Sequence, residues 1–161
     1  MVKHESKFWL ELKNKTPNIS WTRIENTSAL GTPDLLGYNK NQHFFTVELK
    51  VIKGNSKPRF SPHQISFHVK HTNNAFIFIK QKTEVASCYK LYASTSILSL
   101  VTCGVKNLTP VACDLDACAL FLENIYSLVP CHININIYIY TTSSCATLNC
   151  SLLFSSVKRL F

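Results

Sequence analysis

Residues 31–50 read GTPDLLGYNKNQHFFTVELK, and this stretch decides the fold. Its last part predicts a β-strand, because apolar side chains stand at every odd position from Phe45 to Val51. Successive side chains of a strand point to opposite faces, so the odd positions form one apolar face that suits a hydrophobic core. Glu48 and Lys50 are two residues apart and therefore project together from the other face.

A second carboxylate, that of Asp34, precedes this strand and sits in a turn after Gly31. Two carboxylates and one lysine that meet at a strand end are what metal-assisted phosphodiester cleavage requires. The carboxylate oxygens hold a hard divalent cation, and the lysine lies beside an attacking water or the phosphate. Simpler interpretations stay open: Asp34 could cap the turn, and Glu48 and Lys50 could form a surface ion pair that contributes little.

The pattern Pro33-Asp34, thirteen residues, then Glu48-Leu49-Lys50 resembles the PD-(D/E)xK nuclease superfamily. The stretch from about residue 5 to 82 is similar to small phage-type and VRR-NUC-like members, which are neighbours of the Holliday-junction resolvases. The resemblance implies an α/β fold, a three-layer restriction-endonuclease-like core whose mixed central sheet is flanked by helices. It also implies a DNA endonuclease that depends on Mg²⁺ or Mn²⁺.

The resemblance assigns roles to individual residues. Asp34, Glu48 and the main-chain carbonyl of Leu49 would ligate the metal ion, and Lys50 would orient the water or neutralise charge on the phosphate. Family members often bring a glutamate from the first helix toward a second metal position. Glu5 is the residue we match to it, and Glu11 is a rival.

Gln64 has two competing interpretations. The segment Ser61-Pro62-His63-Gln64 predicts a helix over residues 62–71, in which Ser61 is the N-cap and Gln64 occupies the capping-box position. The resemblance instead directs Gln64 to the metal site as a catalytic residue. His68 and His71 share its helical face and could line the rim of a cleft, but they are not included among the catalytic residues.

The positive charge is concentrated in the first part of the chain. Residues 1–90 hold fourteen Lys or Arg and six Asp or Glu, whereas residues 91–161 hold three of each. A basic half favours a polyanionic partner, and together with the carboxylates it indicates DNA. A loop after the site carries Lys53, Lys57 and Arg59, which could clamp the DNA backbone or simply be solvated charge. No pattern for reading base edges is present, so selectivity for DNA structure is expected over sequence specificity.

The remaining elements are predicted from hydrophobic periodicity. An amphipathic helix is expected over 3–15, strands over 20–25, 35–39, 43–51, 75–79 and 88–93, and a further helix over 114–127. This order favours an α/β sandwich with a mixed sheet.

Three parts are expected along the chain: a nuclease core over 1–95, a helical extension over 96–127, and a poorly specified tail over 128–161. The tail alternates Ile with Asn or Tyr without acidic residues, which fits either an added hairpin or a non-native, frameshifted segment. The charged N-terminus lacks a signal pattern and no apolar run spans a membrane, so an intracellular, cytoplasmic protein, plausibly of phage origin, is expected. The seven cysteines lack zinc-type spacing and are expected to be reduced thiols.

Two rival functions stay open. The chain could be a non-catalytic DNA-binding module that retains the nuclease fold, or a chance match in a poorly behaved reading frame. Small nucleases of this kind often pair to cut both strands, so a homodimer is compatible with the resemblance.

Overall fold

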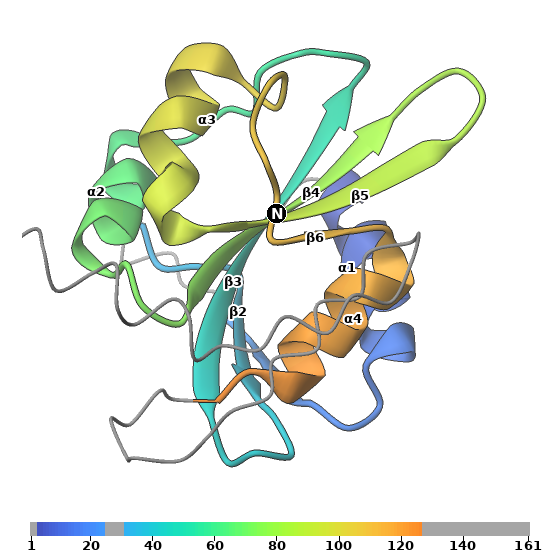
Figure 1. Ribbon diagram of the computed structural model, residues 1–161, viewed down its shortest axis with the longest axis vertical. Coiled ribbons are helices and arrows are strands. Elements are labelled where there is room, and N and C mark those ends of the chain that lie inside the picture. Colours follow the sequence, from blue (N-terminus) through green and yellow to red (C-terminus); the bar gives the residue numbers. More distant parts are fainter. Residues whose placement is uncertain (1–2, 25–30, 127–161) are drawn as a thin grey trace, which may run out of the picture. The chain divides into compact units, whose positions relative to one another are not determined.

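The computed structural model describes residues 3–24 and 31–126, which form a mixed sheet with helices on both faces (Figure 1). The described elements, in chain order, are α1 (Lys3–Lys15), β1 (Ser20–Arg23), β2 (Leu35–Tyr38), β3 (Phe44–Lys53), α2 (Pro62–Lys70), β4 (Ala75–Lys82), β5 (Ser87–Ala93), a 3-10 turn η1 (Ser94–Ser96), α3 (Ile97–Cys103), β6 (Ala112–Cys113) and α4 (Leu115–Asn124). The predicted three-layer α/β architecture is therefore confirmed.

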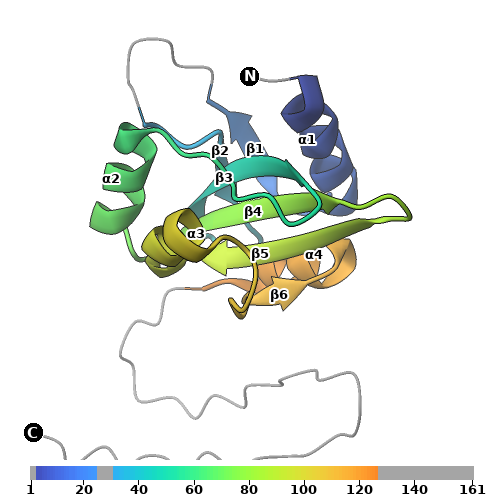
Figure 2. The same cartoon turned by 90° about the horizontal axis from the view of Figure 1, so that it is seen from above.

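The six described strands follow the order β1-β2-β3-β4-β5-β6 across the sheet. β3 and β4 run parallel, and the chain crosses from one to the other through α2. All the other neighbouring strands are antiparallel. Figure 2 shows α1 and α4 on one face of the sheet and α2 and α3 on the other.

The apolar face predicted for β3 lies in the first of two hydrophobic cores. Phe45, Val47 and Leu49 are almost completely buried, and they pack in a cluster with Phe8 and Leu12 of α1. Each such side chain stabilises the fold by roughly 1.5–3 kcal/mol relative to its exposed state. This packing explains the register of β3, because a slip of one residue would turn Glu48 and Lys50 into the apolar layer.

A second core lies on the opposite face, beneath α2 and α3. It is built from buried residues of β3, β4, β5 and the α3 region, namely Ile52, Ile77, Ile79, Tyr92, Ile97, Leu100 and Val105. None of these residues belongs to β1 or β2. Within the described chain, α2 and α3 therefore cover the β3–β5 part of this face, and the β1–β2 part lies outside their core.

Gly37 in β2 has a steric reason to be glycine. A Cβ atom at this position would lie 2.5 Å from the Phe45 ring and 2.9 Å from the Trp21 ring. Those two rings meet edge to face with centroids 5.5 Å apart, so they already fill the space beside Gly37. A side chain here would force this aromatic contact apart.

Several predicted boundaries were wrong. β3 continues to Lys53, so this residue is in the strand and not in the following loop. The last helix begins at Leu115, because the side chain of Asp114 caps it by accepting a hydrogen bond from the Ala117 N–H at 2.7 Å. α3 and β6 were not predicted at all. The tail predicted over 128–161 lies outside the described residues, as do Glu25 and Ser127.

Among the described helices, none combines the length and the apolar character that a membrane crossing requires.

Candidate active site

Asp34 is held against β3 by the main chain. Its Oδ2 accepts a hydrogen bond from the Leu49 N–H at 2.8 Å, and its carbonyl oxygen accepts one from the Ile24 N–H at 2.8 Å. The β2–β3 register pairs Leu35 with Val47, and one further step along it places Asp34 opposite Glu48. The two carboxylates therefore lie on the same sheet face.

Glu48 is the most constrained residue of the site. It is completely buried, and its Oε1 accepts hydrogen bonds from Lys50 Nζ at 2.6 Å and from Gln64 Nε2. Among the described residues, Glu48 Oε2 is buried without a hydrogen-bond partner. A buried carboxylate oxygen of this kind is costly unless something electropositive occupies the space beside it.

The electrostatics of both carboxyl groups follow from their burial. Desolvation raises the pKa of Glu48 to about 7, the charges of Asp34 and Glu5 raise it further, and the Lys50 ammonium opposes the shift. Desolvation also raises the pKa of Asp34 above its ordinary value, while the Leu49 hydrogen bond and the charge of Lys50 lower it. Two buried carboxyl groups with raised pKa values near one lysine are typical of functional sites.

Lys50 links Glu48 to α2 and its preceding loop. Its side chain is only 14% exposed, and its Nζ lies 5.4 Å from the centre of the Phe60 ring. The ring supports the cation from one side while Glu48 binds it from the other. The predicted convergence of Glu48 and Lys50 on one strand face is therefore present as a short, largely buried ion pair.

Gln64 fulfils both of its competing interpretations at once. Its Oε1 accepts the Ser61 N–H at 3.0 Å, and the Ser61 side chain accepts the Gln64 N–H, which completes the capping box. Its Nε2 points the other way and donates to Glu48 Oε1. The helix cap therefore fixes the amide group that holds the carboxylate.

The two candidate glutamates of α1 lie in different environments. The charge of Glu5 contributes to the raised pKa of Glu48, which places Glu5 near the site. Glu11 was a wrong candidate, since it binds Lys80 Nζ at 2.5 and 2.7 Å and accepts the Tyr89 hydroxyl at 3.0 Å. These contacts lie on the α1 side of the sheet, opposite the Glu48 face, because Tyr89 packs against the first core.

His68 is a site neighbour that the sequence reasoning left out of the catalytic set. It is buried, and its Nδ1 lies 2.6 Å from the hydroxyl oxygen of the equally buried Ser94. Desolvation lowers the pKa of His68 to about 4, and the charge of Lys50 adds to the shift. The ring is therefore neutral and lies behind the lysine. Its position four residues after Gln64 was the signal that pointed to it.

The three predicted DNA-binding cations are all exposed, but they differ in their contacts. Lys53 ends β3, and Arg59 follows Pro58 in the loop before α2. Lys57 Nζ donates to the main-chain carbonyl of Thr102 in the last turn of α3. A cation at a helix C-terminus stabilises the helix, so Lys57 also has a structural role.

The residues fit a divalent cation of the hard type. No group of three or more His, Cys, Asp or Glu that could hold a metal occurs among residues 3–24 and 31–126. Mg²⁺ is commonly held by only one or two carboxylates, with waters and substrate phosphates completing its shell. Asp34, Glu48 and the carbonyl of Leu49 provide such a minimal set, and the bare Oε2 of Glu48 is its ready position.

No protein-family model matches the chain, and a search of curated proteins also finds no match. Among solved structures, the chain is similar to Hjc, a Holliday junction resolvase from the archaeal hyperthermophile Archaeoglobus fulgidus, with a TM-score of 0.40 and 15% sequence identity. The match covers 58% of this chain and 76% of that chain. At this level of similarity, a function for the chain has to be derived from its own residues.

Proposed function

We propose that this protein is a divalent-metal-dependent DNA endonuclease that hydrolyses phosphodiester bonds. The observation that carries the proposal is the buried Glu48 carboxylate, which lies opposite Asp34 and keeps one oxygen without a partner in the described chain while Lys50 and Gln64 hold the other. Such an arrangement is costly for the fold and becomes favourable when a cation joins the two carboxylates.

Each side chain would have a definite task. Asp34, Glu48 and the Leu49 carbonyl would hold Mg²⁺ or Mn²⁺, which when bound polarises the phosphate and lowers the pKa of a water. Lys50 would leave its contact with Glu48 as needed to place its ammonium beside the attacking water or the charged phosphate oxygens. Gln64, fixed by the helix cap, would keep the Glu48 carboxylate in one orientation.

A non-catalytic DNA-binding module is the rival function. Binding to phosphates is driven by cations, and two carboxylates on the binding face would repel the DNA unless a metal ion bridges them. The buried position of Glu48 also offers a plain binding module no benefit. The rival therefore leaves the most unusual feature of the site without a purpose.

The finer parts of the proposal concern organisation and selectivity. Residues 1–95 would form the catalytic core, and 96–127 would extend it, since β6 and α4 pack onto β5 and α1. Phosphate contacts from exposed cations would position the DNA without reading its sequence, so the enzyme would select DNA by structure. Action as a homodimer would allow both strands to be cut.

The proposal is tested by cleavage of a labelled panel of duplex, single-stranded, flap and four-way-junction DNA in Mg²⁺, Mn²⁺ or EDTA. Metal-dependent cutting that EDTA abolishes is the expected result. Binding of the same DNAs without any cutting in either metal would overturn the nuclease and favour the binding module.

The exposed cations after the site should dominate the salt dependence of binding. Replacing Lys53 and Arg59 together by alanine should reduce the slope of log binding constant against log salt by about 2, because each phosphate contact contributes about 0.9. Lys57 is left in place, since its bond to Thr102 would confuse stability with binding. The matched control is Lys13→Ala, on exposed α1; an unchanged slope in the double variant would remove this loop from the DNA interface.

A further inference from the structure

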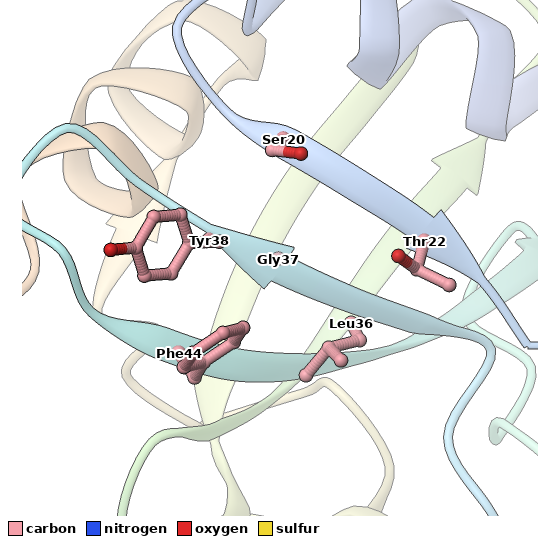
Figure 3. Close-up of a pocket in the computed structure, with 6 residues that line it drawn as sticks. All are labelled: Ser20, Thr22, Leu36, Gly37, Tyr38 and Phe44. Atoms are coloured by element: carbon pink, nitrogen blue, oxygen red, sulfur yellow. The ribbon is translucent and has the colours of Figure 1, made fainter.

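A shallow pocket lies on the sheet across β1, β2 and β3. It has a volume of about 170 Å³ and is lined by Ser20, Thr22, Leu36, Gly37, Tyr38 and Phe44 (Figure 3). The side chains stand on one side of the three strands, with the rings of Tyr38 and Phe44 next to each other. None of these residues has a role in the site described above.

The pocket and the carboxylates share one face of the sheet. Register places Ser20, Tyr38 and Phe44 in one row across the strands and Thr22, Leu36 and Thr46 in the next. Asp34 and Glu48 follow as the third row, because all these positions are separated by two residues along their strands. From Phe44 to Glu48 is four residues of β3, or about 13 Å at about 3.3 Å per residue.

The pocket has the chemistry of an aromatic platform. The Tyr38 and Phe44 rings have centroids 4.5 Å apart at an angle of 42°, and Phe44 is 60% exposed, unusually high for a phenylalanine. Leu36 adds apolar surface, and the hydroxyl groups of Ser20 and Thr22 form the polar rim. A dry cavity of about 150 Å³ can hold one benzene molecule, so this space matches one planar ring of that size.

The charge around the pocket favours a nucleic acid. Residues 20–23 and 35–47 contain no acidic side chain, and exposed Lys40 stands in the turn between Tyr38 and Phe44. Bases in a duplex are already stacked on both faces, whereas an unpaired base can leave the strand and stack on an aromatic side chain. At the phosphate spacing of about 3.4 Å per nucleotide of one strand, 13 Å corresponds to about four nucleotides.

We infer that the pocket lined by Tyr38, Phe44 and Leu36 binds an unpaired nucleobase of the DNA, a few nucleotides from the phosphate at Asp34 and Glu48. This inference rests on the proposed nuclease function and deepens it. The substrate class becomes DNA with a single-stranded segment beside the cut, such as a flap or an opened junction arm. The platform then gives selectivity for structure without reading base edges.

The test uses a duplex with a short 3′ or 5′ single-stranded arm that carries 2-aminopurine, a fluorescent base whose emission falls on stacking. Titrations are made in EDTA, so that binding is observed without cleavage. Wild-type protein should quench the probe in the arm and bind it about tenfold more tightly than the blunt duplex. Phe44→Ala should lose the quenching and this preference, because one base–aromatic stack changes affinity by about tenfold or more.

Two companions keep the outcome interpretable. Phe44→Trp keeps a π-face and should restore quenching and preference, whereas a purely structural role for Phe44 would not be rescued in this way. Leu120→Ala, which removes another exposed apolar side chain on α4, should behave as wild type. The far-ultraviolet circular dichroism of each variant reports folding.

Failure of the inference is distinct from failure of the nuclease. Metal-dependent cutting by wild type, together with equal binding of blunt and armed DNA by wild type and Phe44→Ala, overturns the platform and leaves the nuclease standing. If Phe44→Ala instead converts a dimer into a monomer in sedimentation, with DNA binding unchanged, the face is a contact between copies and the inference is wrong. Armed-DNA preference without any cleavage overturns the nuclease, and the inference in its present form falls with it.

Discussion

Glu48→Gln should reduce metal-dependent DNA cleavage by at least about 100-fold, since even the groups that support metal ligands are worth about 10- to 100-fold. The amide has nearly the same size, and its oxygen can still accept the bonds from Lys50 and Gln64. What disappears is the negative charge that would hold the cation with Asp34. The loss should therefore be catalytic and leave the fold intact.

The measurement is single-turnover cleavage of the preferred substrate over a range of Mg²⁺ concentrations. The matched control is Glu84→Gln, which makes the same change at an exposed position between β4 and β5 and should cut as wild type does. DNA binding by Glu48→Gln should persist or strengthen, because a charge that repels phosphate has been removed. Cleavage within a few-fold of wild type would exclude Glu48 from the metal site.

The same carboxyl group should make the metal-free protein less stable as the pH rises. Its folded pKa of about 7 lies above the unfolded value of 4.5, so the folded state holds the proton longer. Below the unfolded pKa the group costs nothing; between about pH 4.5 and 7 the free energy of unfolding falls, and above pH 7 the full penalty is present. Its upper limit is roughly 3 kcal/mol, from about 1.36 kcal/mol per pKa unit.

His68 acts in the opposite direction over a similar range. Its folded pKa of about 4 lies below the ordinary 6.5, so stability is reduced in acid and recovers as the pH rises toward 6.5. The two effects partly cancel in the wild type. The Glu48→Gln variant keeps His68, so the difference between variant and wild type isolates the carboxyl group.

Urea unfolding in EDTA at several pH values between 4.5 and 8 measures that difference. The variant should gain stability relative to wild type as the pH rises, and the gain should level off above pH 7. Adding Mg²⁺ at pH 8 should then stabilise the wild type but not the variant, because binding to the folded state alone raises its stability. A difference that stays constant with pH would mean that Glu48 is already fully ionised in the folded protein at low pH.

Local patterns accounted for the strand that carries the site. The alternation around Phe45, Val47 and Leu49 sufficed to orient Glu48 and Lys50 toward the other face, because parity in a strand is a property of the backbone alone. The start of α2 was equally local, since Ser61, Pro62 and Gln64 are within four residues of one another. Interactions of this range are encoded in neighbouring side chains.

Two elements were missed because their signals are not local. The helix Ile97–Cys103 is short, and its apolar residues Ile97 and Leu100 gain most of their stability from the second core rather than from helix propensity. The two-residue strand β6 exists through its pairing with Lys90 and Leu91 of β5. Neither length nor composition distinguishes such segments from loops before the partner surface is known.

By itself, the sequence determined the α/β class, the face on which Glu48 and Lys50 stand, the capped start of α2 and the basic character of the first half. Only the tertiary structure decided that Glu48 is completely buried with one bare oxygen, that Gln64 serves the cap and the carboxylate together, and that Glu11 belongs to the opposite face. The physical reason is range. Strand parity and helix caps act over a few residues, whereas burial, pKa values and the partners of a side chain depend on segments brought together from distant parts of the chain.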